Sequence, residues 1–441
     1  MHQGDGATVD FGALGYVPGS IDGLLLADMF EHLYDPWDLV ARRPHSAAHG
    51  GNRFDDHPVL RPGIAAPMKS GVSLKIPLMR PQLPPFDALA PYLREIDETR
   101  WYSNFGPLVT RFEERLAQHY SLPKTGAAVV ANGTTALSAA LLATGAKPGS
   151  KCLVPSWTFV ASASAICGAN MVPHFVDISP EKWQPDPVAL RNRSDLGDVG
   201  AVMVVSPFGA PVDTAAWDEF TADTHIPVII DGAAAFDTVA SAPEARPGKS
   251  PIMISLHATK CLGIGEGGLI LSTADSFIHR VRQVCNFGIW GSPEGQIVGY
   301  NGKVSEYHGA VGLAALDAWP MRRVALQSRT EFYVAELRRI SDVKLLPGYG
   351  GGWVSTYCTA YVPGNIHAVA DRMTYLGVET RRWWHDGVHA LAAYRGFGHD
   401  ELPVTADVAS HVLSLPFFHD MTDEQVVRVV ECLESAMHAS A

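Results

Sequence analysis

The chain has 441 residues, of which 47% are hydrophobic and 18% are charged, and its formal net charge is −12. This composition is typical of a globular protein rather than a disordered one, and the length predicts two or more domains. The 46 acidic residues outnumber the 34 lysines and arginines. Such a surface repels phosphate backbones and excludes nucleic acid as an expected partner, although a small anion can still bind in a local basic pocket.

The six cysteines are scattered along the chain, with no CxxC pair and no metal-like spacing: Cys152, Cys167, Cys261, Cys285, Cys358 and Cys432. The pattern predicts free thiols in a reducing cytoplasm and no metal site. The first residues lack the basic and apolar run of a signal peptide. No segment has the roughly 20 uninterrupted apolar residues of a membrane span, so we expect a cytoplasmic protein that does not interact with membranes.

Residues 1–74 are predicted to be an N-terminal extension and linker. They hold one apolar stretch, Gly23 to Val40, followed by a run rich in His, Arg, Gly and Pro that reaches about Lys69. The stretch LLLADMFEHLYDPWDLV resembles a segment of class I S-adenosylmethionine methyltransferases, in which an acidic–His pair, here Glu31 and His32, precedes Asp-Pro. The glycine-rich loop of those enzymes is absent, so the pattern favours an amphipathic helical extension over a methyltransferase remnant.

Residues 75–326 are predicted to form a large domain. Short β-rich runs such as KCLVP, AVMVVS, IPVIID and PIMISLHA alternate with helical stretches such as ALSAALLATG and ASASAICGA. This alternation favours a mostly parallel sheet with helices on both faces. In such sheets ligands bind beyond the carboxyl ends of the strands, so we expect functional residues to gather there.

Residues 327–441 are predicted to form a smaller C-terminal α/β domain. A helix from Ser328 to Ile340 leads to short strands around Trp353 to Val362. A helix near Ala368 to Leu376 and a final helix from about Asp423 to Met437 follow. The chain shows no internal repeat and no low-complexity tract.

The first chemical motif along the chain is ANGTTALSAALLATG, residues 131–145. A glycine and two threonines begin an alanine-rich helix, and the N–H groups and dipole at a helix start bind phosphate. Threonine at such a position also serves as an ordinary cap, so the motif alone is weak. In the next motif, VPSWTFVASASAI, Trp157 lies between a strand and a helix, where it either packs in the core or stacks on a flat cofactor.

Asp231 ends the apolar strand IPVIID. A carboxylate there is costly unless it has a partner, so it is either a helix cap or the partner of a protonated pyridine nitrogen. Lys260, in SLHATKCLGIGEGG, follows the next strand and precedes a glycine-rich turn. A desolvated lysine amine forms imines with aldehydes. The two residues are about thirty positions apart, which favours neighbouring strands that present both groups to one crevice.

In this order and spacing, the four motifs resemble those of the DegT/DnrJ/EryC1/StrS family, the sugar aminotransferases of pyridoxal phosphate (PLP) fold type I. The resemblance covers roughly residue 75 to the C-terminus. It implies PLP as cofactor, Lys260 as the lysine that holds PLP as an imine, and Asp231 as the partner of the pyridine nitrogen. It also implies phosphate ligands and a ring-stacking aromatic, which are Gly133, Thr134, Thr135 and Ser255 for the phosphate and Trp157 for the ring.

The resemblance further implies a homodimer with shared active sites. The segment GYNGKVSEYHGAVGLAAL matches the family stretch whose asparagine, here Asn301, reaches the partner's phosphate. Lys303, Arg381 and His389 are candidate contacts to a nucleotide diphosphate or sugar, with surface charge or helix-end contacts as the alternative. Two positions depart from many relatives, which carry His or Gln where this chain has Ala234 and His where it has Ser206.

The implied activity is transfer of an amino group from glutamate to a nucleotide-linked keto-sugar. The segment LGVETRRWWHDGVH resembles that of family members acting at C4 of dTDP-4-keto-6-deoxy sugars. A PLP-dependent sugar dehydratase is an alternative, although family dehydratases carry histidine in place of the lysine. A non-catalytic regulatory relative is a second alternative, and the intact Lys260, Asp231 and phosphate loop count against it.

Overall fold

The computed structural model describes residues 75–440, which belong to one compact unit. The predicted extension and linker over residues 1–74, with its methyltransferase-like segment, lies outside the described residues. The α-helices are α3 (Phe86–Thr99), α4 (Pro107–His119), α5 (Gly133–Thr144), α6 (Val160–Gly168), α7 (Pro187–Arg191), α8 (Thr214–Thr224), α9 (Thr238–Ser241), α10 (Asp275–Val284), α11 (Glu306–Leu337), α12 (Ile366–Tyr375), α13 (Pro403–His411) and α14 (Asp423–Ser440). The strands are β1 (Ala127–Val130), β2 (Lys151–Pro155), β3 (Val172–Val176), β4 (Val199–Val205), β5 (Val228–Asp231), β6 (Ile252–Ser255), β7 (Gly268–Leu271), β8 (Lys344–Leu345), β9 (Cys358–Tyr361) and β10 (Val412–Leu415).

A seven-stranded sheet in the order β1-β7-β6-β5-β4-β2-β3 forms the centre of the unit. Strands β3, β2, β4, β5 and β6 are parallel, whereas β7 pairs antiparallel with both β1 and β6. This arrangement confirms the predicted α/β class with a mostly parallel sheet. Strands β5 and β6 are buried along their whole length and β4 along its last five residues, as expected where helices cover both faces of a sheet.

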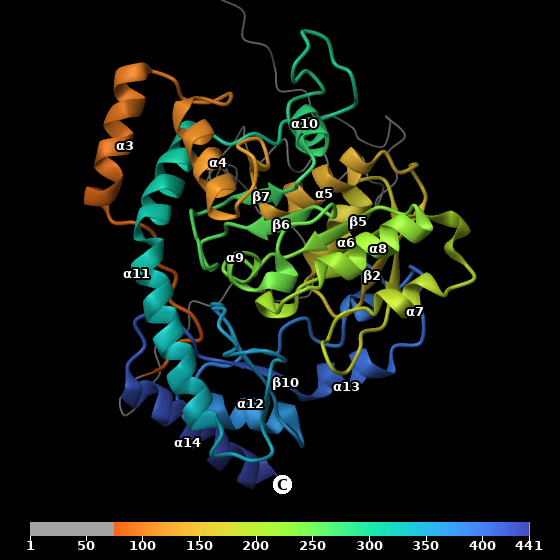
Figure 1. Cartoon of the computed structure of the whole chain (residues 1–441). Coiled ribbons are helices and arrows are strands. Elements are labelled where there is room, and N and C mark those ends of the chain that lie inside the picture. Colours follow the sequence, from red (N-terminus) through yellow and green to blue (C-terminus); the bar gives the residue numbers. More distant parts are fainter. Residues whose placement is uncertain (1–74, 441) are drawn as a thin grey trace, which may run out of the picture. The chain divides into compact units, whose positions relative to one another are not determined.

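Helices cover both faces of this sheet (Figure 1). On one face, α5, α6 and α10 pack against alternate strand residues such as Val154, Met203 and Ile270. On the other face, where α4 and α8 contact the strands, the intervening residues such as Val204 and Ile254 join the larger cluster of core side chains. Because successive strand residues point to opposite faces, each strand contributes to both apolar layers.

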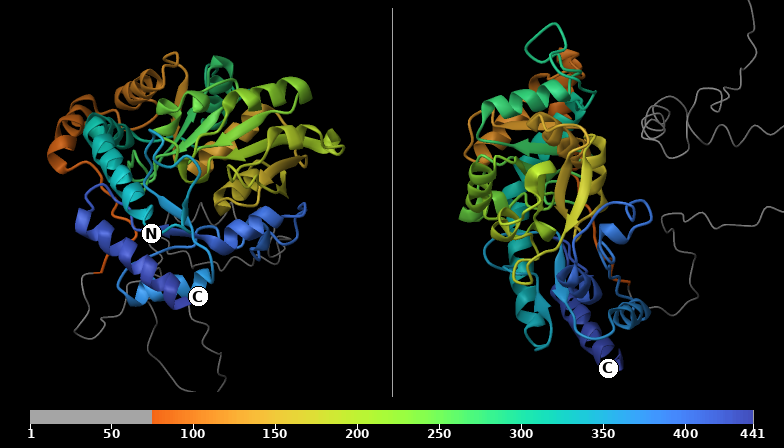
Figure 2. Two further views of the ribbon diagram at one scale, coloured as in Figure 1. Left: turned by 60° about the horizontal axis from the view of Figure 1, so that its bottom comes forward. Right: turned by 90° about the vertical axis from the view of Figure 1, so that its right-hand side faces the viewer.

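A second sheet, of three antiparallel strands in the order β10-β9-β8, lies in the C-terminal part of the chain. Helices α12 and α14 pack together beside it, at the end of the unit where the C-terminal segments gather (Figure 2). The long helix α11 begins at Glu306, well before the helix predicted from Ser328, and contacts both α4 and α14. It therefore crosses the expected boundary near residue 326, and the division into two domains there stays a prediction.

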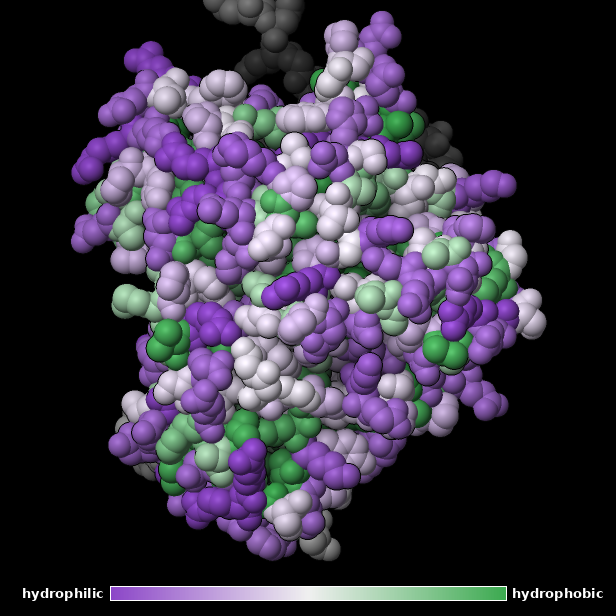
Figure 3. Space-filling view, viewed as in Figure 1, coloured by the Kyte–Doolittle hydropathy of each residue, from purple (hydrophilic) through white to green (hydrophobic). Residues whose placement is uncertain are grey.

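The surface of the described unit is mixed (Figure 3). Hydrophilic side chains predominate on the face shown, and hydrophobic ones gather towards the end where α12 and α14 lie. Within residues 75–440, no helix combines the length and the apolar character that crossing a bilayer requires.

Candidate active site

A cavity of about 670 Å³ lies at the carboxyl ends of the parallel strands. Its walls come from the ends of β4, β5 and β6, the start of α5 and the turn after β2, with further residues from the C-terminal part of the chain. Small-molecule sites measure roughly 300–1,000 Å³ and occur at this edge of open α/β sheets. The position therefore agrees with the edge that the sequence predicts.

Lys260 lines this cavity in the turn that follows β6. Its backbone N–H donates to the carbonyl of His257, which closes a tight turn and sets the lysine past the strand end. The side-chain Nζ donates a hydrogen bond of 2.8 Å to Oη of Tyr357 and lies 5.0 Å from the centre of the same ring. The amine therefore faces the cavity, with one tyrosine as its neighbour.

Asp231 ends β5 and is 6% exposed. Its Oδ2 accepts a hydrogen bond of 2.7 Å from Oγ of Ser162, and its Oδ1 accepts one of 3.1 Å from the backbone N–H of Ala233. Burial raises the pKa of this carboxyl, while the hydrogen bonds from Ser162 and Ala233 and the nearby charge of Lys260 act in the opposite direction. Because β5 and β6 are neighbouring parallel strands, Asp231 and Lys260 reach the same cavity.

The start of α5 forms another wall, through Gly133 and Thr134. Oδ1 of Asn132 caps the helix by accepting from the N–H of Thr135 at 2.8 Å. Ser255, the last residue of β6, lies opposite, and a Cβ added to Gly133 would stand 3.4 Å from its Cβ. A Cβ on Gly268 would stand 2.3 Å from the carbonyl oxygen of Asn132, so glycine there lets the helix start approach the sheet.

Aromatic side chains form the remaining walls. Phe159, Phe208, Tyr357, Trp383 and Trp384 all line the cavity. Phe208 stacks on Trp384 with ring centres 4.3 Å apart, and Tyr357 meets Trp383 edge to face at 5.7 Å. Aromatic walls of this kind suit a flat ligand.

The structure places Trp157 in the core, the first of the two positions that its motif allows. This side chain is 1% exposed, packs edge to face on Trp384 at 5.1 Å and does not line the cavity. Phe159, two residues later in the same motif, is 55% exposed and does line it. The chain turns between the end of β2 at Pro155 and the start of α6, and this turn sends the larger ring into the core.

The other predicted site residues are divided between the cavity and its surroundings. Arg381 lines the cavity, with its guanidinium 4.7 Å from the centre of the Trp383 ring. Thr135 lies in the first turn of α5 but outside the lining, and Asn301 is exposed outside it.

Lys303 lies over the ring of Phe287 at 4.8 Å, and Nδ1 of His389 forms a 2.7 Å hydrogen bond with Oγ of Ser156. Neither Lys303 nor His389 lines the cavity.

Sequence reasoning missed Tyr357, Ser162 and the aromatic walls. Tyr357 is 97 residues from Lys260, so no local pattern points to it. Ser162 and Phe159 lie within the motif VPSWTFVASASAI, but only the turn into α6 decides which of its side chains face the cavity. Ser206 and Ala234, the positions that depart from many relatives, both line the cavity.

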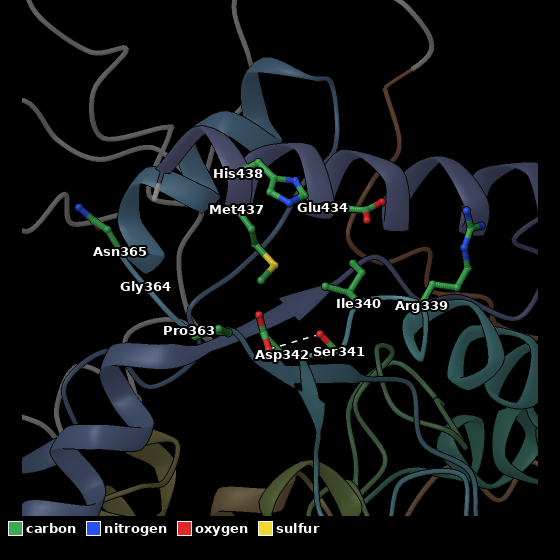
Figure 4. A pocket seen from close by; sticks show the side chains of 10 residues that line it. All are labelled: Arg339, Ile340, Ser341, Asp342, Pro363, Gly364, Asn365, Glu434, Met437 and His438. Atoms are coloured by element: carbon green, nitrogen blue, oxygen red, sulfur yellow. Dashed lines mark hydrogen bonds between the residues drawn. The ribbon is translucent and has the colours of Figure 1, made fainter.

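Other parts of the described unit are weaker candidates for an active site. Among residues 75–440, no group of three or more His, Cys, Asp or Glu side chains is arranged to hold a metal ion. A second hollow of about 360 Å³ lies beside the end of α14 (Figure 4). Its carboxylates and Arg339 surround no common point, and Arg339 is already paired with Glu336 at 2.9 Å. The cavity around Lys260 is therefore the candidate active site.

Comparisons with known proteins show the family and fold to which the chain is similar. The sequence model of the DegT/DnrJ/EryC1/StrS aminotransferase family matches residues 87–434. Protein Rv3402c of Mycobacterium tuberculosis is 30% identical over 376 residues, covering 82% of this chain and 90% of the relative. The dTDP-4-amino-4,6-dideoxy-D-glucose transaminase of Shigella dysenteriae is 26% identical over 360 residues, covering 80% and 97%. The crystal structure of a putative PLP-dependent aminotransferase from Bacillus cereus superposes with a TM-score of 0.76 at 28% identity, covering 82% of this chain and all of the other.

Proposed function

The chain belongs to the DegT/DnrJ/EryC1/StrS aminotransferase family, and from that premise we propose that it transfers the amino group of glutamate to a nucleotide-linked keto-sugar. It is a PLP-dependent aminotransferase, like its structural neighbours. For the acceptor we propose a dTDP-4-keto-6-deoxyhexose. The relative from Shigella dysenteriae, whose name gives a dTDP-4-amino-4,6-dideoxyglucose, supports that choice.

The residues around the cavity fit PLP. Within residues 75–440, the buried Asp231 accepts hydrogen bonds from Ser162 and Ala233 but forms no ion pair, so a protonated ring nitrogen would supply a positive partner. Gly133, Thr134 and Ser255 gather at a helix start, which suits the phosphate. Phe159 offers an exposed ring to the flat face of the cofactor.

The proposed chemistry assigns one task to each of these side chains. When bound, PLP supplies an aldehyde that condenses with amines and a ring that withdraws electron density. Asp231 holds the proton on the ring nitrogen, and its hydrogen bonds from Ser162 and Ala233 keep the carboxylate oriented. The amine of Lys260 accepts and returns the proton at the carbon that carries the transferred nitrogen, which is general acid–base work.

Substrate contacts are proposed for Arg381, whose exposed guanidinium at the cavity is free to pair with an anionic group of either substrate. Lys303, His389 and Asn301 lie outside the cavity of one chain. We propose that Asn301 and Lys303 serve the active site of a partner in a homodimer. His389 supports the wall indirectly, through Ser156 in the turn after β2.

The single observation that carries the proposal is that Lys260, Asp231 and the start of α5 line one cavity. The test is a panel of nucleotide-linked keto-sugars incubated with the PLP-loaded enzyme and glutamate, with products identified by mass. We expect one sugar to exchange its keto oxygen for an amino group, and we expect no product without glutamate. A product that forms without glutamate and has lost water would indicate the dehydratase instead. The absence of any product across the panel would contradict the proposal.

Phe159 and Trp157 can be separated by experiment. Phe159→Ala is expected to weaken PLP binding by about threefold to tenfold, the value of one aromatic stacking contact. The stability of the cofactor-free protein should change little, because the side chain is 55% exposed. Trp157→Ala should instead lower the free energy of unfolding by about 3–5 kcal/mol, as expected for a buried aromatic residue.

The measurements for this pair are a PLP titration followed by absorbance and a denaturation curve of each cofactor-free variant. If Trp157→Ala lost PLP affinity at unchanged stability while Phe159→Ala did not, the assignment of the stacking ring to Phe159 would be wrong.

A further inference from the structure

Tyr357 is the one residue that bonds to the side chain of Lys260 within the described part of the chain. The lysine Nζ donates to the tyrosine oxygen at 2.8 Å, and no other hydrogen bond of that hydroxyl occurs within residues 75–440. Tyr357 is 8% exposed, and it lines the cavity beside the lysine. A hydrogen bond from an ammonium group is stronger than one between neutral groups, and partial exclusion of water strengthens it further.

The segment around Tyr357 is hydrogen-bonded directly to the turn that carries Lys260. Thr356 donates through Oγ1 to the carbonyl of Thr259 at 3.0 Å, and Cys261 donates through Sγ to the carbonyl of Val354 at 3.8 Å. Together with the bond between Lys260 and Tyr357, these contacts join residues 259–261 to residues 354–357 at three successive points. The separation between lysine and tyrosine is therefore fixed by both segments of the chain.

Both the backbone and the ring of Tyr357 are held by further contacts. Oγ of Ser355 accepts from the N–H of Tyr357 at 3.3 Å and donates to the carbonyl of Phe208 at 2.6 Å. The ring lies between those of Phe208 and Trp383, with both centre-to-centre distances at 5.7 Å. Ser355 is fully buried, so this support is shielded from water. A tyrosine held on all these sides has lost most of its rotational freedom before any ligand binds.

We propose that Tyr357 is a positioning residue for Lys260. Its hydroxyl accepts a proton of the lysine amine and holds the amine towards the cavity whenever the amine is not bonded to another group. This proposal rests on the proposed function, which gives Lys260 its chemical role. The hydroxyl restricts an otherwise flexible side chain to one orientation. Preorganisation of this kind raises the rate of the step that uses the amine.

The test compares the wild type with Tyr357→Phe, which removes the hydroxyl and keeps the ring. The cofactor-free proteins are treated with acetic anhydride at one mildly alkaline pH, and acetylation of the Lys260 peptide is followed by mass spectrometry. Without the hydrogen bond to Tyr357 the amine is freer to move and to reach the reagent, so we expect Lys260 to react about tenfold faster, which is the effect of losing one hydrogen bond. The labelling of Lys124 in the same samples provides the internal standard.

Tyr361→Phe is the matched control, because Tyr361 lies four residues further on at the end of β9 and its hydroxyl bonds to Asp407 instead. It should label like the wild type. Labelling of Lys260 in Tyr357→Phe that is equal to or slower than in the wild type would overturn the proposal. This readout needs neither cofactor nor sugar, so it stands even where the proposed sugar chemistry fails.

A second readout separates positioning from packing. In the loaded enzyme, Tyr357→Phe should lower kcat by about tenfold, a fraction of the effect of a general acid–base group, and leave KM for glutamate unchanged. A loss of packing around the cavity would raise KM and lower the melting temperature instead. A kcat equal to that of the wild type would also overturn the proposal.

Discussion

Lys260→Ala is expected to lower turnover by at least about 10⁴-fold, because the variant loses both the group that bonds to the cofactor and the general acid–base. We expect the purified enzyme to absorb visible light after addition of PLP, and this absorbance should disappear in the variant. Stability should change little, since the lysine side chain forms one hydrogen bond and borders an open cavity. The measurements are an absorbance spectrum, a coupled turnover assay and a melting curve.

The matched control for Lys260→Ala is Lys124→Ala. Lys124 has an 80% exposed side chain in a 3.4 Å ion pair with Glu114, and surface pairs of this kind contribute at most about 1 kcal/mol. The control should keep both absorbance and turnover. A wild-type protein that stays colourless after PLP addition, or a Lys260→Ala variant that keeps turning over, would remove the basis for assigning chemistry to this lysine.

Asp231→Asn is expected to lower turnover by about 10²–10³-fold, the usual effect of losing one preorganised electrostatic partner. The asparagine keeps the shape and the bond from the N–H of Ala233, but it has no charge with which to hold a proton on the ring nitrogen. PLP should still bind through its phosphate and through Lys260. Turnover within a few-fold of the wild type would contradict the role of Asp231 and leave it a buried structural carboxylate.

The same variant makes a prediction about pH. Burial raises the folded-state pKa of Asp231 above that of the unfolded chain. Folding therefore favours the neutral form of the carboxyl group. The stability that this preference contributes is present below the unfolded pKa of about 4, and it is lost as the pH rises through the folded pKa. At neutral pH, cofactor-free Asp231→Asn should consequently melt at the same temperature as the wild type or higher. PLP should stabilise the wild type more than the variant, and melting curves with and without PLP measure this difference.

Ser162 holds the same carboxylate in place through hydrogen bonds. Ser162 donates to Asp231 and also shares a 2.7 Å hydrogen bond with Thr158, so the carboxylate is held by a short buried chain of hydroxyl groups. All three side chains are at most 6% exposed. This chain explains how an aspartate at the end of an apolar strand keeps one orientation in the cofactor-free protein.

Much of the architecture could be read from the sequence, because the relevant patterns are local. The run VIID is apolar up to its last residue, and such a run between helical patterns forms a buried parallel strand whatever its neighbours are. Its final aspartate then stands at the carboxyl edge of the sheet. The same argument sets Lys260 just past β6 and the glycine–threonine pair at the start of α5. For that reason the sequence predicts the correct edge of the sheet for the cavity.

Local spacings of a few residues in the sequence predict the apolar strands of the large sheet and the charged groups at its edge, whereas they miss residues 306–327, the first part of α11. The direction of a side chain in the turn after β2 depends on how α6 and Trp384 pack, so the placement of Trp157 in the core and of Phe159 at the cavity follows from tertiary contacts. The contact between Lys260 and Tyr357, 97 residues apart, follows from tertiary contacts as well. Contacts between distant segments depend on how whole layers pack, and no short pattern in the chain encodes them.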